Sequence, residues 1–167
     1  MFKIGDQVLY GSHGACTIVG TEQMRFGKTK GNYYVLQPLQ QADSKFYVPM
    51  DNETAVAKLS PLLSQEALLE LLHSDAVRSN TWIADESLRK QRYKELINSG
   101  DRPALLNMIY CLHRHKQAQQ AAGKKFHQCD ENFLHDAQKL LNSEFALAFG
   151  LEPGQVNDFI ASHMNEP

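Results

Sequence analysis

The chain has 167 residues, of which 43% are hydrophobic and 22% are charged, and its formal net charge at pH 7 is -2. This composition is too apolar for a disordered chain, and the length allows one domain or two small ones. The charge balance argues against nucleic-acid binding through overall positive charge, so such binding would need a local patch. No apolar run approaches the roughly 20 residues of a membrane span, and no cleavable signal precedes the first residues, so we expect a soluble cytoplasmic protein without a membrane partner.

Residues 1–58 have the pattern of short β-strands separated by turns. Alternating, β-branched or aromatic runs are separated by glycine-rich segments; the runs are DQVLYG, GACTIVG, NYYVLQPL and KFYVPM. Several short strands joined in this way predict a small SH3/Tudor-like all-β barrel. Pro49 cannot donate a ladder hydrogen bond, so its strand is expected at an edge or to end there.

From Leu59 onward the hydrophobic period becomes helical. Helices are predicted over SQEALLELLHS, after the N-cap residue Asp101, from near Asp130 to Gly150, and after Pro153. The fold class is therefore predicted as α+β in two domains, in which the barrel over residues 1–58 precedes an all-α helical domain over residues 64–167.

Two groups of residues raise the question of an enzyme or a metal centre. His13 and Cys16 could form a Cys–His nucleophile, but they lie at a predicted turn without a third residue to orient the histidine. A second group is rich in thiols and imidazoles but lacks the paired spacing of zinc ligands; it comprises Cys111, His113, His115, His127, Cys129 and His135. The three cysteines are few and far apart, which favours reduced thiols. We therefore expect no enzyme activity, metal, cofactor or small-molecule substrate.

The segment NTWIADESLRKQRY contains the only tryptophan, Trp82, followed by basic residues. A helix beginning there would place Trp82 on one stripe with Arg89, Tyr93 and Leu96, which is typical of a core. An indole in front of Arg89, Lys90 and Arg92 also suits a wedge against DNA, with the cations on phosphates. The residues alone leave both interpretations open.

The opening segment FKIGDQVLYGSHGACTIVG resembles the signature of CarD-like bacterial transcription regulators, a module that also occurs in transcription-repair coupling factor. The runs YYVLQPL and KFYVPMDN resemble the next two strands of that family. Trp82, the SGD of Ser99–Asp101 and LLNSEFALAFG resemble its helical half. Two departures stand out: QRY begins only at Gln91, and Phe46 and Tyr47 occupy positions where arginine is common.

The resemblance implies a Tudor-like domain that docks on the β subunit of RNA polymerase and a helical domain that contacts upstream promoter DNA. The implied polymerase-binding residues are Arg25, Phe46, Tyr47 and Pro49. The implied DNA-binding residues are Trp82, Arg89, Lys90 and Arg92. DNA recognition would be largely independent of sequence, since a wedge and phosphate contacts read shape. The alternative is a protein-only adaptor that docks on polymerase or another partner without touching DNA.

Overall fold

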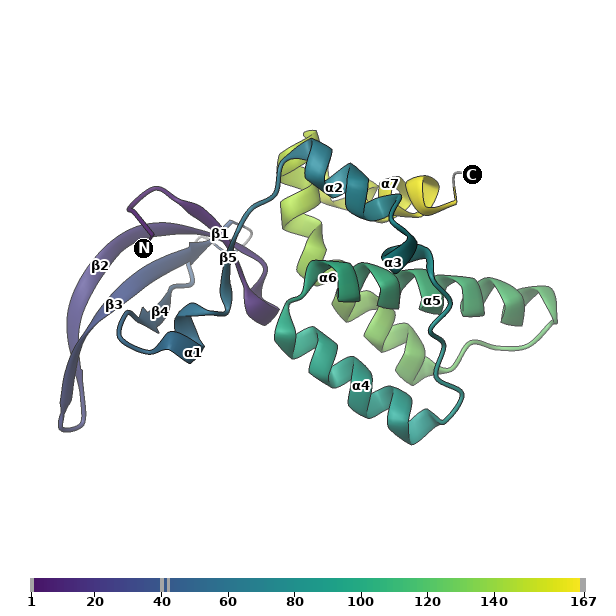
Figure 1. Ribbon diagram of the computed structural model, residues 1–167, viewed down its shortest axis with the longest axis horizontal. Helices are drawn as coiled ribbons and strands as arrows, with labels where there is room; N and C mark the ends of the chain where they lie inside the picture. The colour runs from purple at the N-terminus through teal and green to yellow at the C-terminus, as the bar shows by residue number, and fades with distance from the viewer. Residues whose placement is uncertain (1, 40, 42, 166–167) are drawn as a thin grey trace. The chain divides into compact units, whose positions relative to one another are not determined.

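The computed structural model describes residues 2–39, 41 and 43–165. The chain divides into two compact units, Met1–Leu62 and Leu63–Pro167, each with its own hydrophobic core. Figure 1 shows the strands in the first unit and most of the helices in the second. The fold is thus an antiparallel sheet followed by a mostly helical part.

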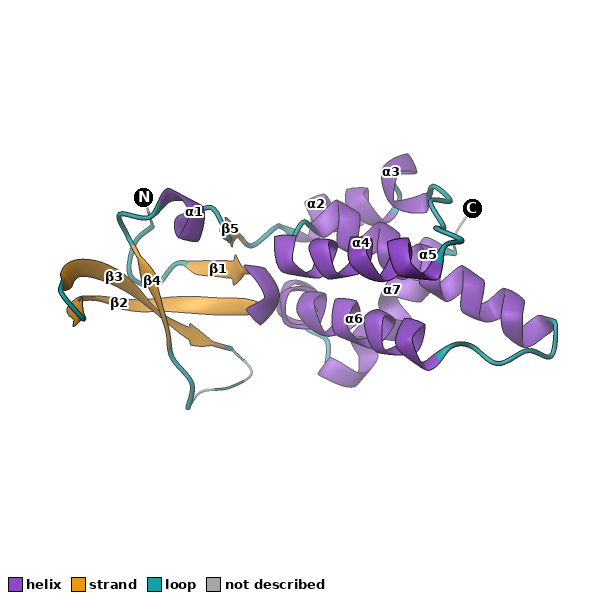
Figure 2. Cartoon of the chain, turned by 90° about the horizontal axis from the view of Figure 1, so that it is seen from below, coloured by secondary structure: helices purple, strands orange, loops and turns teal. Residues whose placement is uncertain are grey.

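The first unit is a five-stranded antiparallel sheet with the strand order β4-β3-β2-β1-β5. Its strands are β1 (Gln7–Tyr10), β2 (Ala15–Phe26), β3 (Thr29–Pro38), β4 (Phe46–Pro49) and β5 (Leu59–Pro61). The long curved hairpin of β2 and β3 dominates this unit (Figure 2). Gly27 forms its turn with a φ of 62°, a left-handed conformation that glycine adopts without strain. Two short helices complete the unit: the 3-10 helix η1 (Gly11–His13) and α1 (Glu53–Val56).

The sheet buries one face because its apolar residues recur with the two-residue period of a strand. The core of this unit is made by Val8, Cys16, Ile18, Tyr34, Leu36, Val48 and Leu59. Because Leu59 belongs to this core, β5 fastens the end of the first unit to β1.

The second unit packs α-helices and short helical turns around a larger core. In chain order its elements are α2 (Gln65–Leu72), α3 (Asp75–Arg78), α4 (Glu86–Ser99), α5 (Arg102–Ala121), α6 (Gln128–Phe149), η2 (Pro153–Gln155) and α7 (Val156–Met164). The core residues come mainly from α5 and α6, which lie side by side in both views (Figures 1 and 2).

Local sequence explains where these helices begin and end. The side chains of Ser64, Ser74 and Asp85 each accept a hydrogen bond from a backbone N–H in the first turn of the helix that follows. Gly100 and Gly150 end α4 and α6 in the left-handed conformation.

The structure corrects three expectations about these elements. Leu59–Pro61 is strand β5, and the helical period starts only with α2 at Gln65. The short helix α3 was not predicted. The helix expected from Trp82 begins at Glu86 instead, because Asp85 provides the N-cap and residues 79–85 have no regular structure.

Candidate nucleic-acid and protein interfaces

Trp82 lies in the irregular segment between α3 and α4, and its side chain is partly buried against the helical core. Its indole stacks on the imidazole of His115 from α5, with ring centroids 3.8 Å apart and planes inclined by 13°. The guanidinium carbon of Arg89 lies 4.6 Å from the centroid of the same indole. Trp82 is therefore neither a fully buried core residue nor a fully exposed wedge, but a partly buried ring held by two neighbours.

Arg89 is the predicted DNA contact that the structure places in the interior. It is only 4% exposed, and its Nε and Nη2 donate to the two carboxylate oxygens of Asp130 at 2.9 and 3.0 Å. Its Nη1 donates to the carbonyl oxygen of Ile83 at 3.0 Å. These bonds use the guanidinium within the fold, so Arg89 supports the loop of Trp82 and is not available to a phosphate.

Lys90 and Arg92 remain on the surface of α4, where each pairs with a carboxylate of the same helix. Lys90 Nζ lies 3.0 Å from Glu86 Oε1, and Arg92 Nη1 lies 3.5 Å from Glu95 Oε2. The hydrogen bond and charge of Glu86 raise the pKa of Lys90. Exposed pairs of this kind contribute little, so a phosphate can compete for both cations.

The loop between α5 and α6 brings residues to this site that the sequence did not single out. Phe126 lies 6.2 Å from His115 by ring centroids, and the exposed Lys124 and Lys125 precede it directly. These lysines lie more than 40 positions after Trp82 in the chain, so local spacing could not associate them with it. Their adjacency to a glycine and an aromatic residue, GKKF, was the available signal.

The predicted polymerase-facing residues lie mostly on β4, which is an edge strand as Pro49 predicted. Phe46 packs against His13 and Tyr10, with ring centroids 4.3 and 5.8 Å apart. Tyr47 is 38% exposed. Because successive residues of a strand point to opposite faces, Tyr47 presents its ring to solvent, whereas Phe46 packs within the sheet unit.

Arg25 does not face this strand. It pairs with Lys30 near the end of the β2–β3 hairpin, whereas β4 pairs with residues 33–36 of β3. Since β3 separates β2 from β4, the expectation of a strand around Arg25 facing Phe46 and Tyr47 was wrong. Arg25 is exposed, and its Nε donates to the carbonyl oxygen of Gly27 at 3.3 Å.

Two cysteines that were candidates for a nucleophile or a metal ligand, Cys16 and Cys111, are buried within the fold. Cys16 is fully buried, and burial raises the pKa of its thiol to about 11, so it stays protonated at neutral pH. The backbone N–H of Thr81 lies 3.4 Å from Cys111 Sγ. Over residues 2–39, 41 and 43–165, no three histidine, cysteine or acidic side chains gather closely enough to hold a metal ion. Over the same residues, no helix is long and apolar enough to cross a membrane.

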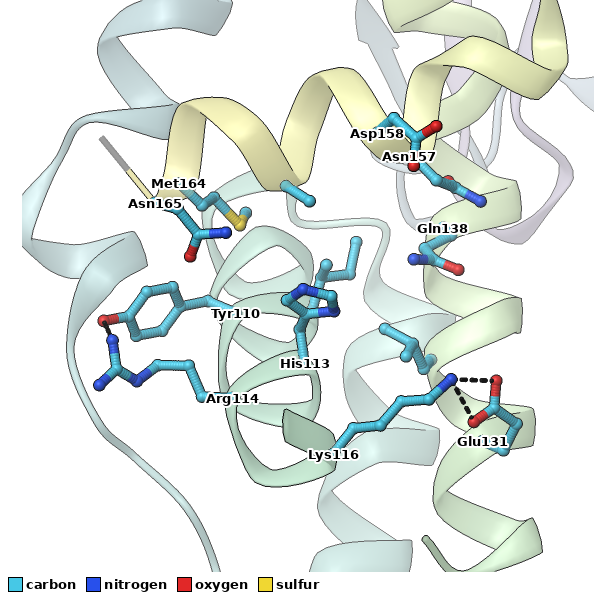
Figure 3. Close-up of a pocket in the computed structure, with 13 residues that line it drawn as sticks. Tyr110, His113, Arg114, Lys116, Glu131, Gln138, Asn157, Asp158, Met164 and Asn165 are labelled. Carbon is cyan, nitrogen blue, oxygen red and sulfur yellow. Dashed lines mark hydrogen bonds and ion pairs between the residues drawn. The ribbon is translucent and has the colours of Figure 1, made fainter. Parts of the chain in front are cut away.

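A hollow of about 180 Å³ lies between α5, α6 and α7. Figure 3 shows the ring of His113 near its centre, and burial, with a smaller contribution from Lys116, lowers the pKa of that imidazole. Lys116 Nζ pairs with Glu131 at 2.9 Å, and Arg114 Nη1 donates to the Tyr110 hydroxyl at 3.0 Å. None of the predicted DNA-binding or polymerase-binding residues lines this hollow, so the candidate interfaces are Trp82 with its surroundings and the edge strand β4.

The comparisons with known proteins agree with this organisation. Residues 2–60 match the family described as the CarD-like/TRCF RID domain, which coincides with the sheet unit. The N-terminal domain of this chain therefore belongs to that family, and the resemblance seen in its opening segment is confirmed. Domains of this family interact with RNA polymerase and have a Tudor-like fold.

A relative extends the similarity beyond this domain. YdeB of Bacillus subtilis (strain 168), whose name describes it as a candidate transcription factor, is 24% identical over 165 residues. The aligned region covers 95% of this chain and 99% of the relative. The similarity thus spans both units, and the family of the N-terminal domain suggests a transcription factor that interacts with RNA polymerase.

Proposed function

We propose that this protein is a non-enzymatic bacterial transcription regulator that docks on the β subunit of RNA polymerase and contacts upstream promoter DNA, thereby modulating the stability of the open complex. The observation that carries the proposal is the match of the whole sheet unit to a polymerase-interacting family. The partly buried tryptophan of the helical unit supplies the second contact.

Docking uses the outer edge of β4. An edge strand offers main-chain donors and acceptors to an added strand, and an exposed aromatic residue supplies the anchor. Tyr47 meets this requirement, since it is exposed on β4 and its strand pairs with β3 on one side. The partner surface is accordingly a β-strand with an apolar recess for a tyrosine ring.

DNA contact centres on Trp82 and on exposed lysines of the helical unit. A partly exposed indole can enter the minor groove at the edge of the melted region, and Lys90, Lys124 and Lys125 can neutralise phosphates. None of these contacts reads a base edge in the major groove, so recognition is largely independent of sequence.

The docking part is tested with the isolated fragment of residues 1–62, which includes β5 and its whole core. The expected result is a folded fragment that binds the β-subunit lobe as tightly as the full chain binds it. Failure of the folded fragment to bind, while the full chain binds, would place the docking surface elsewhere.

The DNA part is tested by Trp82→Ala in an assay of open-complex lifetime, at a temperature where all variants are folded. Phe159→Ala is the matched control, because Phe159 is another partly buried aromatic residue of the helical unit, packed 4.6 Å from Phe149 by ring centroids. Trp82→Ala is expected to shorten the lifetime and Phe159→Ala to leave it unchanged. Equal behaviour of the two variants would contradict a wedge.

The protein-only adaptor remains the second candidate, and the burial of Arg89 favours it because the helical surface then offers one cation fewer than predicted. Co-purification with polymerase in the presence and absence of promoter DNA separates the two functions. An adaptor binds equally in both conditions, whereas a DNA-contacting regulator binds more tightly when the promoter is present.

A further inference from the structure

The backbone on both sides of Trp82 is fixed, although the segment has no regular structure. Before it, Thr81 Oγ1 donates to Asn107 Oδ1 of α5 at 2.6 Å. After it, the carbonyl oxygen of Ile83 accepts from Arg89 of α4 at 3.0 Å. The backbone path is therefore fixed. The remaining freedom is rotation of the indole about the side-chain bonds of Trp82.

Two groups contact the indole: the guanidinium of Arg89 and the imidazole of His115, which stacks on its face. The near-parallel stack at 3.8 Å is the closest ring contact of Trp82 among the described residues. His115 is itself held, since its Nε2 lies 3.2 Å from Gln119 Nε2 one turn further along α5. Helix α5 therefore holds the imidazole in place, and the indole stacks on that imidazole.

We propose that His115 is the positioning residue of Trp82, which holds the indole in one orientation before DNA arrives. This inference rests on the proposed function for its consequence, because a ring that is already ordered loses less conformational entropy when it enters DNA. His115 itself need not touch the DNA.

The surroundings of His115 favour its neutral form. Burial lowers its pKa, the carboxylate of Asp130 acts in the opposite direction, and the charges of Arg89 and His127 lower it again. The neighbouring Lys116 on α5 pairs with Glu131. The folded protein binds a proton at His115 less readily than the unfolded chain does. The neutral imidazole therefore contributes stability that is fully present above pH 6.5 and is lost as the pH falls through the lowered pKa of His115.

Intrinsic fluorescence tests the contact without DNA, because Trp82 is the only tryptophan. A protonated imidazole in contact with an indole quenches its emission by accepting an electron. Emission of the native protein is expected to drop as the pH is lowered from about 8 to about 5, with a midpoint below the ordinary histidine value. His115→Phe should abolish the pH-dependent drop in emission but keep the Trp82 indole shielded from acrylamide. His115→Ala should abolish the drop and also expose the indole to acrylamide.

His113→Ala is the control on the same helix, and this variant should retain the pH-dependent drop.

The open-complex assay then separates the inference from the proposed function. His115→Ala should shorten the lifetime roughly three- to tenfold, the size expected when one side chain is no longer ordered in advance, and His115→Phe should restore it. A pH-dependent drop that persists in His115→Phe, or an unchanged acrylamide accessibility in His115→Ala, overturns the inference. So does a lifetime that depends on Trp82 but not on His115. If the fluorescence results hold while Trp82→Ala leaves the lifetime unchanged, the positioning role stands and the DNA function falls.

Discussion

At the scale of single residues, Arg89 and Asp130 form a buried pair that joins α4 to α6, with side chains 5% and 1% exposed. Removing the arginine leaves a carboxylate without its partner in a dry environment. We expect Arg89→Ala to destabilise the protein by roughly 3–5 kcal/mol, as measured by urea unfolding.

Lys90→Ala and Arg92→Ala are the controls for Arg89, because both side chains belong to the same helix but lie on its surface. Each is expected to change the free energy of unfolding by no more than about 0.5 kcal/mol. A stable Arg89→Ala variant that binds DNA more weakly would show that the guanidinium leaves Asp130 and reaches a phosphate.

Phe46 and Tyr47 are neighbours with different tasks. Phe46→Ala removes ring contacts with His13 and Tyr10 and should lower stability by about 1–3 kcal/mol, less than for a fully buried phenylalanine. Tyr47→Ala should leave the melting temperature nearly unchanged and weaken binding to the β-subunit lobe. Unchanged binding by both folded variants would exclude β4 as the docking strand.

At the scale of elements, the loop between α5 and α6 carries the exposed Lys124 and Lys125 next to Phe126. If both lysines neutralise phosphates, the double change to alanine should reduce the slope of log affinity against log salt by about 0.9 for each phosphate that is no longer neutralised. Lys139→Ala, an exposed lysine within α6, is the control and should leave the slope unchanged. An unchanged slope in the double variant would remove this loop from the DNA surface.

Elements with strong local signals could be predicted from the sequence, and those that depend on distant partners could not. The hairpin strands, the glycine that ends α6 and the edge position of Pro49 all follow from local patterns. Strand β5 is too short for a period to be recognised, and it forms because β1 offers a free edge to Leu59–Pro61.

The site around Trp82 was predicted only in part for the same reason. A stripe of residues on one helix cannot reveal that Asp130, 41 positions after Arg89, withdraws that arginine from the surface. Nor can it reveal that His115 stacks on the indole. The cluster of basic residues identified the right region of the chain, but long-range pairing decides which cations stay exposed.

At the scale of the whole molecule, a net charge of -2 gives little general attraction to DNA. Two weak contacts in one chain can still produce firm binding, because the first contact raises the local concentration of the second. The proposed regulator can therefore bind DNA despite an acidic overall balance.

The connection between the two units is held at both of its ends. Pro61 pairs with Val8 in the sheet, and the backbone N–H of Leu63 donates to the buried carboxylate of Glu144 at 3.2 Å. Leu62 alone lies between these anchored residues, and one residue spans at most about 3.6 Å. The connecting segment itself therefore adds almost no length that could extend. Inserting Gly-Ser-Gly-Ser after Leu62 should leave polymerase docking intact and weaken the combined binding to a polymerase–promoter complex. Undiminished combined binding would mean that the length of the connecting segment does not limit the protein.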